Sequence, residues 1–129
     1  MEKADISNCI VKVFKKRDGR VSFHLRSHVI FRTKVSFSIK AYFKGVTGFI
    51  QFPGEEWREF PIWLAIDAAV PYDGKHQVHE FGGSFISSRH STKPCMATVK
   101  FIFVFNIHGV EYTFKAQRIA VVKRGQRGV

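Results

Sequence analysis

Alternating basic residues are the first feature of this sequence that points to chemistry. In the segment 29–44, one parity is apolar and the other carries cations, hydroxyl groups and one tyrosine. The members of this second set that could contact a ligand are Arg32, Lys34, Lys40, Tyr42 and Lys44. Cations hold the phosphates of a single-stranded nucleic acid, and aromatic rings stack on its bases regardless of base sequence. The pattern therefore predicts a basic sheet face that binds single-stranded DNA or RNA.

Further cations are expected to extend this binding face. Lys100 and Lys115 fall on outward positions of the last predicted hairpin, and Lys123 and Arg124 follow it. The formal net charge of the chain is +11 and it is unevenly placed. Eleven Lys and Arg stand against three acids in the first 44 residues, and seven against one after residue 92, whereas the middle of the chain is mildly acidic. Such a field attracts polyanions and repels other copies of the chain.

Six histidines suggest two other kinds of site. His76 and His79 would point to opposite faces of a strand, which argues against a metal site. Two histidines and a lysine could cleave RNA by general acid–base catalysis if the fold brought them together. There is no P-loop, dinucleotide fingerprint or complete nucleophile elbow. We therefore expect no enzyme activity, no cofactor and no metal, with a small His/Lys-dependent hydrolase such as an RNase as an alternative.

A short segment, Lys44 to Phe52, resembles the RNA-binding signature of RRM and cold-shock domains at its Gly-Phe-Ile end. It has one extra residue, and Val46 or Thr47 stands where the first stacking aromatic would be. No residue role is carried over from those families.

The elements that must position these residues are mostly strands, because apolar and polar residues alternate along most of the chain. The predicted strands are 9–15, 21–26, 29–44 and 77–81, followed by a hairpin that turns at His108-Gly109. Residues 60–66 form a strand or one short helix, since Pro61 excludes a long helix. Gly82-Gly83 indicates a bulge or a close backbone approach. A change of parity predicts a further bulge near Gln117.

About eight strands with short turns and little helix predict an all-β domain. Its architecture is an antiparallel sandwich, jelly-roll-like or immunoglobulin-like, or a small barrel. The expected core contains Phe23, Phe31, Val35, Phe37, Phe101, Phe103 and Phe105. The 129 residues fit a single domain with flexible ends at residues 1–8 and 123–129. No signal peptide or membrane span is visible, so an intracellular protein, cytoplasmic or nuclear, with free thiols at Cys9 and Cys95 is expected.

These patterns favour a non-enzymatic nucleic-acid-binding β domain. The main alternative is a structural subunit of a virus or phage, in the host cell or the virion, because a small, basic, Phe-rich domain can pack against copies of itself and a genome. A homo-oligomer or larger assembly is the expected partner in that case. A membrane is expected in neither.

Overall fold

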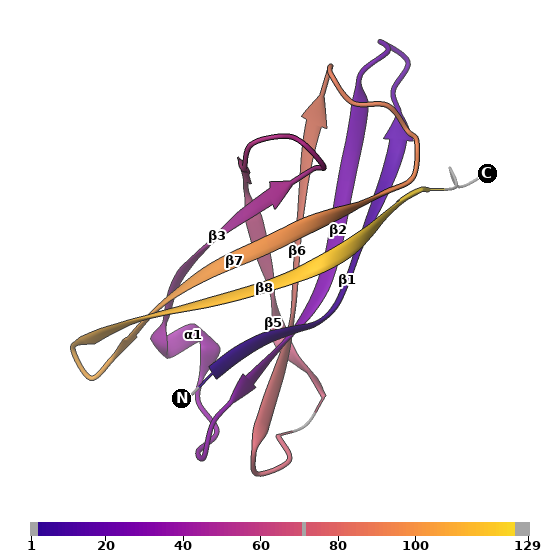
Figure 1. Ribbon diagram of the computed structural model, residues 1–129. Helices are drawn as coiled ribbons and strands as arrows, with labels where there is room; N and C mark the ends of the chain where they lie inside the picture. Colours follow the sequence, from indigo (N-terminus) through magenta and orange to yellow (C-terminus); the bar gives the residue numbers. More distant parts are fainter. Residues whose placement is uncertain (1–2, 71, 126–129) are drawn as a thin grey trace.

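In the part of the chain that the structure describes, the protein forms one strongly curved sheet of eight strands with a single short helical turn (Figure 1). The structure, a computed structural model, describes residues 3–70 and 72–125. The strands are β1 (Lys3–Lys15), β2 (Val21–Arg32), β3 (Phe43–Gln51), β4 (Arg58–Phe60), β5 (Ile62–Val70), β6 (His76–Ser87), β7 (Cys95–Ile107) and β8 (Val110–Arg124). The helical turn α1 (Ile39–Tyr42) directly precedes β3.

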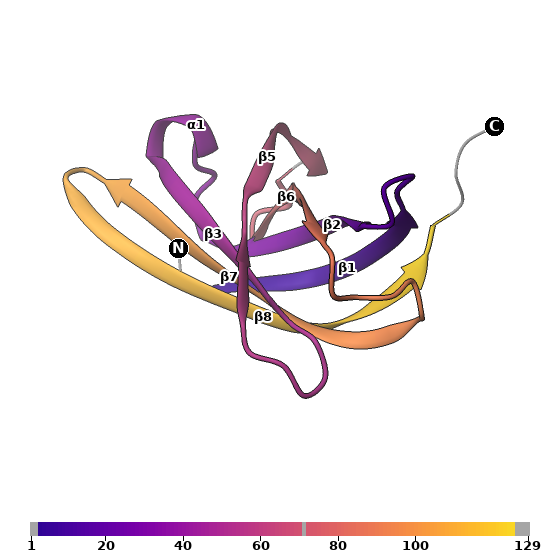
Figure 2. The same ribbon diagram turned by 90° about the horizontal axis from the view of Figure 1, so that it is seen from above.

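The strand order in the sheet is β4-β3-β7-β8-β1-β2-β6-β5. All paired strands are antiparallel except β1 and β8, which run parallel. The two strands at the ends of this order, β4 and β5, are joined through Pro61, and the sheet is nearly closed into a barrel (Figure 2). The predicted all-β class with about eight strands is confirmed. Alternation within a strand does not show which strand lies beside it, so the parallel pair is not visible in the sequence.

Phenylalanine rings fill the inside of the barrel. Phe101, Phe103 and Phe105 alternate along β7 and are fully buried, as the period of two predicts. The ring centroid of Phe103 lies 5.1 Å from that of Phe81 and 5.3 Å from that of Phe31, both edge to face. Burying one such side chain stabilises the fold by about 2 kcal/mol before entropy is subtracted. These contacts therefore hold β2, β6 and β7 against one another.

The predicted strand 29–44 is wrong in its second half. β2 ends at Arg32, residues 33–38 are irregular, and α1 interrupts the alternation before β3 begins. Val35, expected in the core, is 72% exposed. The alternation of the sequence continues through this segment although no strand pairs with it. Thr33 N donates to the Lys75 carbonyl, and side chains form further hydrogen bonds with the segment.

Several side chains hold this irregular segment, among them those of Ser38 and Gln77. Ser38 Oγ accepts a hydrogen bond from Ala41 N at 3.2 Å and caps α1. The amide of Gln77 on β6 donates to the Phe37 carbonyl at 2.8 Å and accepts from Phe37 N at 3.0 Å. The same amide nitrogen lies 2.8 Å from Nε2 of His79, and burial lowers the pKa of His79. Phe37 is thereby kept against the core although it lies on no strand.

The barrel closes where β5 passes two glycines of β6. A Cβ on Gly83 would lie 2.5 Å from the carbonyl oxygen of Pro61 and 2.9 Å from the ring of Phe60. At Gly82 a Cβ would instead meet the indole of Trp63, which covers this position. The predicted close approach of two backbones at Gly82-Gly83 is confirmed. Residues 60–66 form strands on either side of Pro61, not a helix.

The last hairpin, β7 with β8, forms as predicted. His108 has a φ of 52° and Gly109 a φ of 82°, the left-handed pair that a type I′ turn requires. The two strands pair along their length without a register shift, so the predicted bulge near Gln117 is wrong. Ile119 and Val121 change parity because they face outward and are exposed.

The ends of the described chain are strands. Residues 3–8, expected to be flexible, belong to β1, and Lys123 and Arg124 belong to β8. Beyond them, Gly125 N donates a hydrogen bond to the Val13 carbonyl at 2.9 Å. The rest of the expected flexible ends, residues 1, 2 and 126–129, lies outside the described residues.

Both cysteines are free thiols, as predicted. Burial raises the pKa of Cys9 to about 12, although the nearby Arg118 guanidinium acts in the opposite direction. Cys95 is half-buried, and burial together with the charge of Glu55 raises its pKa as well. No helix in the described part of the chain is long and apolar enough to cross a membrane.

Candidate functional site

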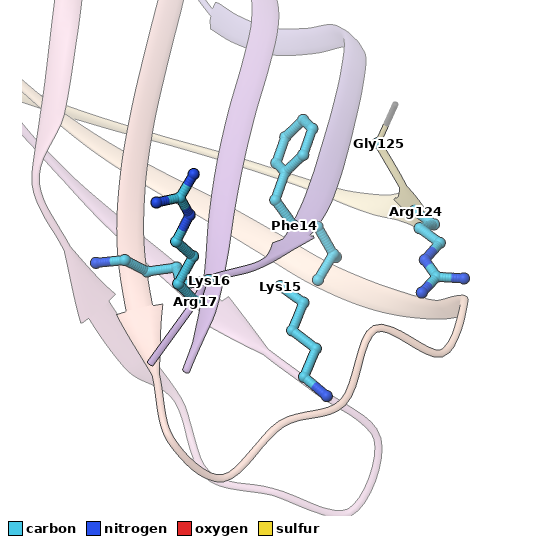
Figure 3. A pocket seen from close by; sticks show the side chains of 7 residues that line it. Phe14, Lys15, Lys16, Arg17, Arg124 and Gly125 are labelled. Carbon is cyan, nitrogen blue, oxygen red and sulfur yellow. The ribbon is translucent and has the colours of Figure 1, made fainter. Parts of the chain in front are cut away.

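One end of the barrel carries a dense group of cations from β1, the β1–β2 turn and the end of β8. We call this group the basic end: Lys12, Lys15, Lys16, Arg17, Lys123 and Arg124. A hollow of about 370 Å³ opens there, lined by Val13, Phe14, Lys15, Lys16, Arg17, Arg124 and Gly125 (Figure 3). The basic side chains spread around the hollow and do not converge on one point (Figure 3). This arrangement suits an extended polyanion better than a single small anion.

Parallel pairing of β1 with β8 brings these cations together. The register places Lys12 directly opposite Lys123. The hydrogen bond from Gly125 N to the Val13 carbonyl fixes the end of β8 beside β1. The ring of Phe14 lies against Gly125, where a Cβ would collide with it. The Phe14 ring and the adjacent ends of β1 and β8 therefore form one surface.

Acids within the described residues do not pair with the basic end. None of its six cations forms an ion pair with another described residue. The nearby Asp18 is bound to Arg20, whose guanidinium lies 2.6 Å from its carboxylate. The hydrogen bonds from Arg20 lower the pKa of Asp18, and the charge of Lys16 lowers it as well. Like charges on directly opposite strand residues are destabilising, so repulsion between Lys12 and Lys123 lowers the stability of the fold.

A second hollow, also of about 370 Å³, adjoins the first on the outer face of β1 and β2. Its lining is Asn8, Ile10, Lys12, His24, Arg26, Ser27, His28 and Glu80. The ring of Phe14 contacts the His24 ring edge to face at 5.4 Å and so connects the two hollows. Lys12 is the register partner of His24. Arg26 forms an ion pair with Glu80 at 3.2 Å, so the positive charge of Arg26 is balanced on this face.

The structure separates the cations that were predicted to share one strand face. Arg32 and Lys34 line a hollow of about 600 Å³ together with Lys75, at the opposite end of β2 from the basic end. Lys40 lies in α1, and its side chain is outside the described part of the structure. The interruption at residues 33–42 is the reason, because these cations no longer follow one alternating strand.

Tyr42, Lys44 and Lys115 lie toward the β7–β8 turn. Tyr42 is half-buried, and its ring centroid is 5.8 Å from that of His108. Lys44 forms an ion pair with Glu111 at 3.0 Å. Lys115 is exposed on β8, closer to the hairpin turn than to the basic end. These three residues do not join a common surface with Lys123 and Arg124.

Lys100 faces outward on β7, as predicted, and its ammonium lies over two aromatic rings. The distance from Nζ to the ring centroid is 4.9 Å for Phe49 and 4.3 Å for Trp57. A cation over an aromatic face is held by the ring quadrupole. Of the residues predicted to bind nucleic acid, Lys123 and Arg124 are the two that belong to the basic end.

Sequence alone missed the β1 part of the basic end. The run Lys12-Val13-Phe14-Lys15-Lys16-Arg17 places four cations and an aromatic ring directly before the Asp18-Gly19 turn. This run was the available signal, since Lys12 and Phe14 have the outward parity of the first strand. Lys123 and Arg124 on β8 were predicted from their charge, but their position beside β1 carried no signal, because the parallel pairing of the two strands is a tertiary feature.

The histidines of the outer face do not form an acid–base pair at one point. His24 and His28 are four residues apart on β2, which is about 13 Å along a strand. His24 Nε2 lies 2.9 Å from the hydroxyl of Ser22, which is on the side of His24 away from His28. Within the described ranges, no group of three or more His, Cys, Asp and Glu side chains could hold a metal ion.

A Ser–His–Glu chain of hydrogen bonds links the loops that follow β3 and β6. Ser87 Oγ lies 2.6 Å from Nδ1 of His90, and Nε2 of His90 lies 2.9 Å from the Glu55 carboxylate. Ser87 is buried, and its hydroxyl also accepts a hydrogen bond from Arg89 N at 3.2 Å. The hollow beside His90, of about 310 Å³, is not lined by Ser87. A nucleophile must reach its substrate, and the buried Ser87 is not placed to do so; these hydrogen bonds tie the two loops together.

Comparison with known proteins finds no family model, no curated protein and no solved structure that matches this chain. The chemistry of the basic end is therefore the basis for a functional proposal.

Proposed function

We propose that this protein is a non-enzymatic nucleic-acid-binding β domain that holds single-stranded DNA or RNA at the basic end. The observation that carries the proposal is the unneutralised set of six cations, with Lys12 and Lys123 side by side. Lys12 and Lys123 repel each other, and neither forms an ion pair with an acid among the described residues. Phosphates would relieve it, and release of their counterions would supply most of the affinity.

The geometry supports an extended strand over a compact anion. Adjacent strands are about 4.8 Å apart, so Lys12 and Lys123 form a narrow pair across the sheet, with His24 on the next strand. Lys15 at the end of β1 and the turn residues Lys16 and Arg17 continue this charge around the end of the barrel (Figure 3). A sugar-phosphate backbone crossing the barrel end would contact these cations in succession.

Aromatic rings beside the cations supply the second component of the proposal. Phe14 is half-buried and lines the hollow of the basic end, while His24 is exposed beside it. Stacking of a base on one such ring contributes about 1–3 kcal/mol and is tolerant of base identity. The proposed binding is therefore weakly dependent on sequence and strongly dependent on salt.

An RNase-like hydrolase has less support. General acid–base catalysis at one phosphate needs both groups within hydrogen-bond reach of the reacting atoms. The spacing of His24 and His28 along β2 exceeds that reach, and Arg26 between them is paired with Glu80.

The proposal is tested by reversing charge at the basic end and at a matched distant position. The double variant Lys12→Glu, Lys123→Glu changes the net charge by the same amount as Lys75→Glu, Lys115→Glu. All four residues are exposed. Binding of labelled oligothymidine and oligouridine is measured by fluorescence anisotropy at about 50 mM salt, after circular dichroism has shown that both variants are folded.

We expect the parent to bind with a Kd tighter than about 100 µM, because ordinary non-specific affinity is already in that range at physiological salt. The variant at the basic end should bind at least about tenfold more weakly, and the distant variant should stay close to the parent. Equal losses in the two variants would mean that net charge alone attracts the oligonucleotide. No binding by the parent would refute the proposal.

A further inference from the structure

A row of exposed aliphatic side chains crosses the outer face of the sheet beside the basic end. Met96 on β7 is 51% exposed, Val121 on β8 is 47% exposed and Ile119 is 62% exposed. Val121 is the register partner of both Met96 and Ile10, so three adjacent strands place these side chains in line. We call these three exposed residues, Met96, Ile119 and Val121, together with the half-buried Ile10, the apolar row. Contiguous exposed apolar groups mark interaction surfaces more often than scattered ones do.

The charges around the apolar row are nearly all positive. Lys12 and Lys123 lie two residues further along β1 and β8 on the same outer face. Arg26 is the register partner of Ile10, with Glu80 bound to it. Among the described residues, Glu80 is the one acid that lines the adjoining hollow. A surface that fits this face therefore has an apolar centre and acidic flanks.

We propose that the apolar row is a docking surface for an acidic segment of a partner protein that carries aliphatic anchors. Its side chains would cover Ile119, Val121 and Met96, and its carboxylates would pair with Lys12 and Lys123. Complementary charge sets the orientation and the association rate of such contacts, while the apolar centre supplies most of the affinity.

Two other occupants fit the observations less well. A second copy of the chain would bring Lys12 and Lys123 of both copies toward the same interface, because a symmetric dimer uses the same patch twice. A nucleic acid would satisfy the cations but not the apolar centre, since bases stack on aromatic rings and the apolar row is entirely aliphatic.

The test uses a synthetic peptide with the proposed chemistry: a Leu-Ser-Val-Ser-Leu centre with three glutamates on each side. Two control peptides replace either the aliphatic residues by serine or the glutamates by lysine. Protein variants are Ile119→Ser with Val121→Ser, and Val110→Ser as a matched control. Val110 is 52% exposed on the same strand but lies at the hairpin turn, far from the basic end.

We expect the parent protein to bind the first peptide at least about tenfold more tightly than either control peptide. The Ile119→Ser, Val121→Ser variant should lose at least about tenfold in peptide affinity, while its melting temperature and its oligonucleotide affinity stay at the parent values. Val110→Ser should leave peptide affinity unchanged. Because the oligonucleotide is measured on the same variants, failure of this proposal is distinguishable from failure of nucleic-acid binding.

Three results would overturn the proposal. The first is equal affinity for the peptide with and without its aliphatic residues. The second is concentration-dependent dimerisation in sedimentation that disappears in the Ile119→Ser, Val121→Ser variant, which would assign the row to a second copy. The third is binding to phosphatidylcholine vesicles containing about a third phosphatidylserine that the same variant loses, which would assign the row to a membrane surface.

Discussion

Replacing Gly83 by alanine is expected to destabilise the barrel where it closes. The new Cβ would lie 2.5 Å from the Pro61 carbonyl oxygen and 2.9 Å from the Phe60 ring. The carbonyl belongs to the backbone of the β4–β5 kink, so relief requires a shift of that whole segment. Overpacking of this kind costs about 1–3 kcal/mol. For a chain of this length, each kcal/mol lowers the melting temperature by about 4 °C.

The matched control for this prediction is Gly82→Ala on the same strand. The atoms nearest to its Cβ belong to the indole of Trp63, a side chain that is 48% exposed and can shift more easily than a backbone carbonyl. We expect a smaller loss of stability than for Gly83→Ala, accompanied by a red shift of tryptophan fluorescence. Both variants are compared with the parent by thermal and urea unfolding followed by circular dichroism.

A melting temperature of Gly83→Ala at or above the parent value would refute this reasoning. Neither glycine has a positive φ, so alanine would by itself stabilise by about 0.4–1 kcal/mol through the unfolded state. A net loss therefore reports the collision with Pro61. A loss of the same size in Gly82→Ala would show that β5 does not approach β6 in the manner described.

Three further predictions concern protonation, the chain end and the thiols. Burial lowers the pKa of His79 below its ordinary 6.5, so the unfolded state binds the proton first and the free energy of unfolding should fall as the pH drops below about 6.5. In a plot of the urea midpoint against pH, His79→Gln should flatten the region below about pH 6.5. An unchanged profile in that variant would contradict the buried neutral ring. Ending the chain at Val122 removes the hydrogen bonds between the last part of β8 and β1, including that of Gly125. Each is worth about 1 kcal/mol, so the melting temperature should fall by several degrees. An unchanged melting temperature would mean that the end of β8 is not held against β1. Ellman's reagent should label the half-buried Cys95 in the native protein and Cys9 only on unfolding, because Cys9 is buried with a pKa of about 12. Equal labelling rates in the native protein would argue against that burial.

Much of the fold could be predicted from the sequence, because local patterns determine it. The alternating phenylalanines of β7 and the His108-Gly109 turn are short-range signals, and both are confirmed. Segment 33–42 was wrong because alternation alone does not make a strand; here Gln77, distant in sequence, takes the hydrogen bonds of a neighbouring strand. Ile119 was misread as evidence for a bulge, since apolar residues were assumed to face inward.

The candidate site was less accessible to sequence analysis, because it depends on which strands are neighbours. Lys123 was identified from its charge, but its position opposite Lys12 follows from the parallel pairing of the first and last strands. Pairing across the length of the chain leaves no trace in local periodicity. The net charge suggests a polyanionic partner, which stays a prediction, and only the register shows where the cations lie together on the fold.

The salt dependence of oligonucleotide affinity tests the central claim most directly. Each phosphate held by a cation contributes about −0.7 to the log–log slope for a single strand, so engagement of all six cations of the basic end gives about −4. We predict a slope near this value for the parent, a slope weaker by at least about 1 for Lys12→Glu, Lys123→Glu, and the parent slope for Lys75→Glu, Lys115→Glu. Identical slopes for the two variants, or no binding by the parent at about 50 mM salt, would contradict the account.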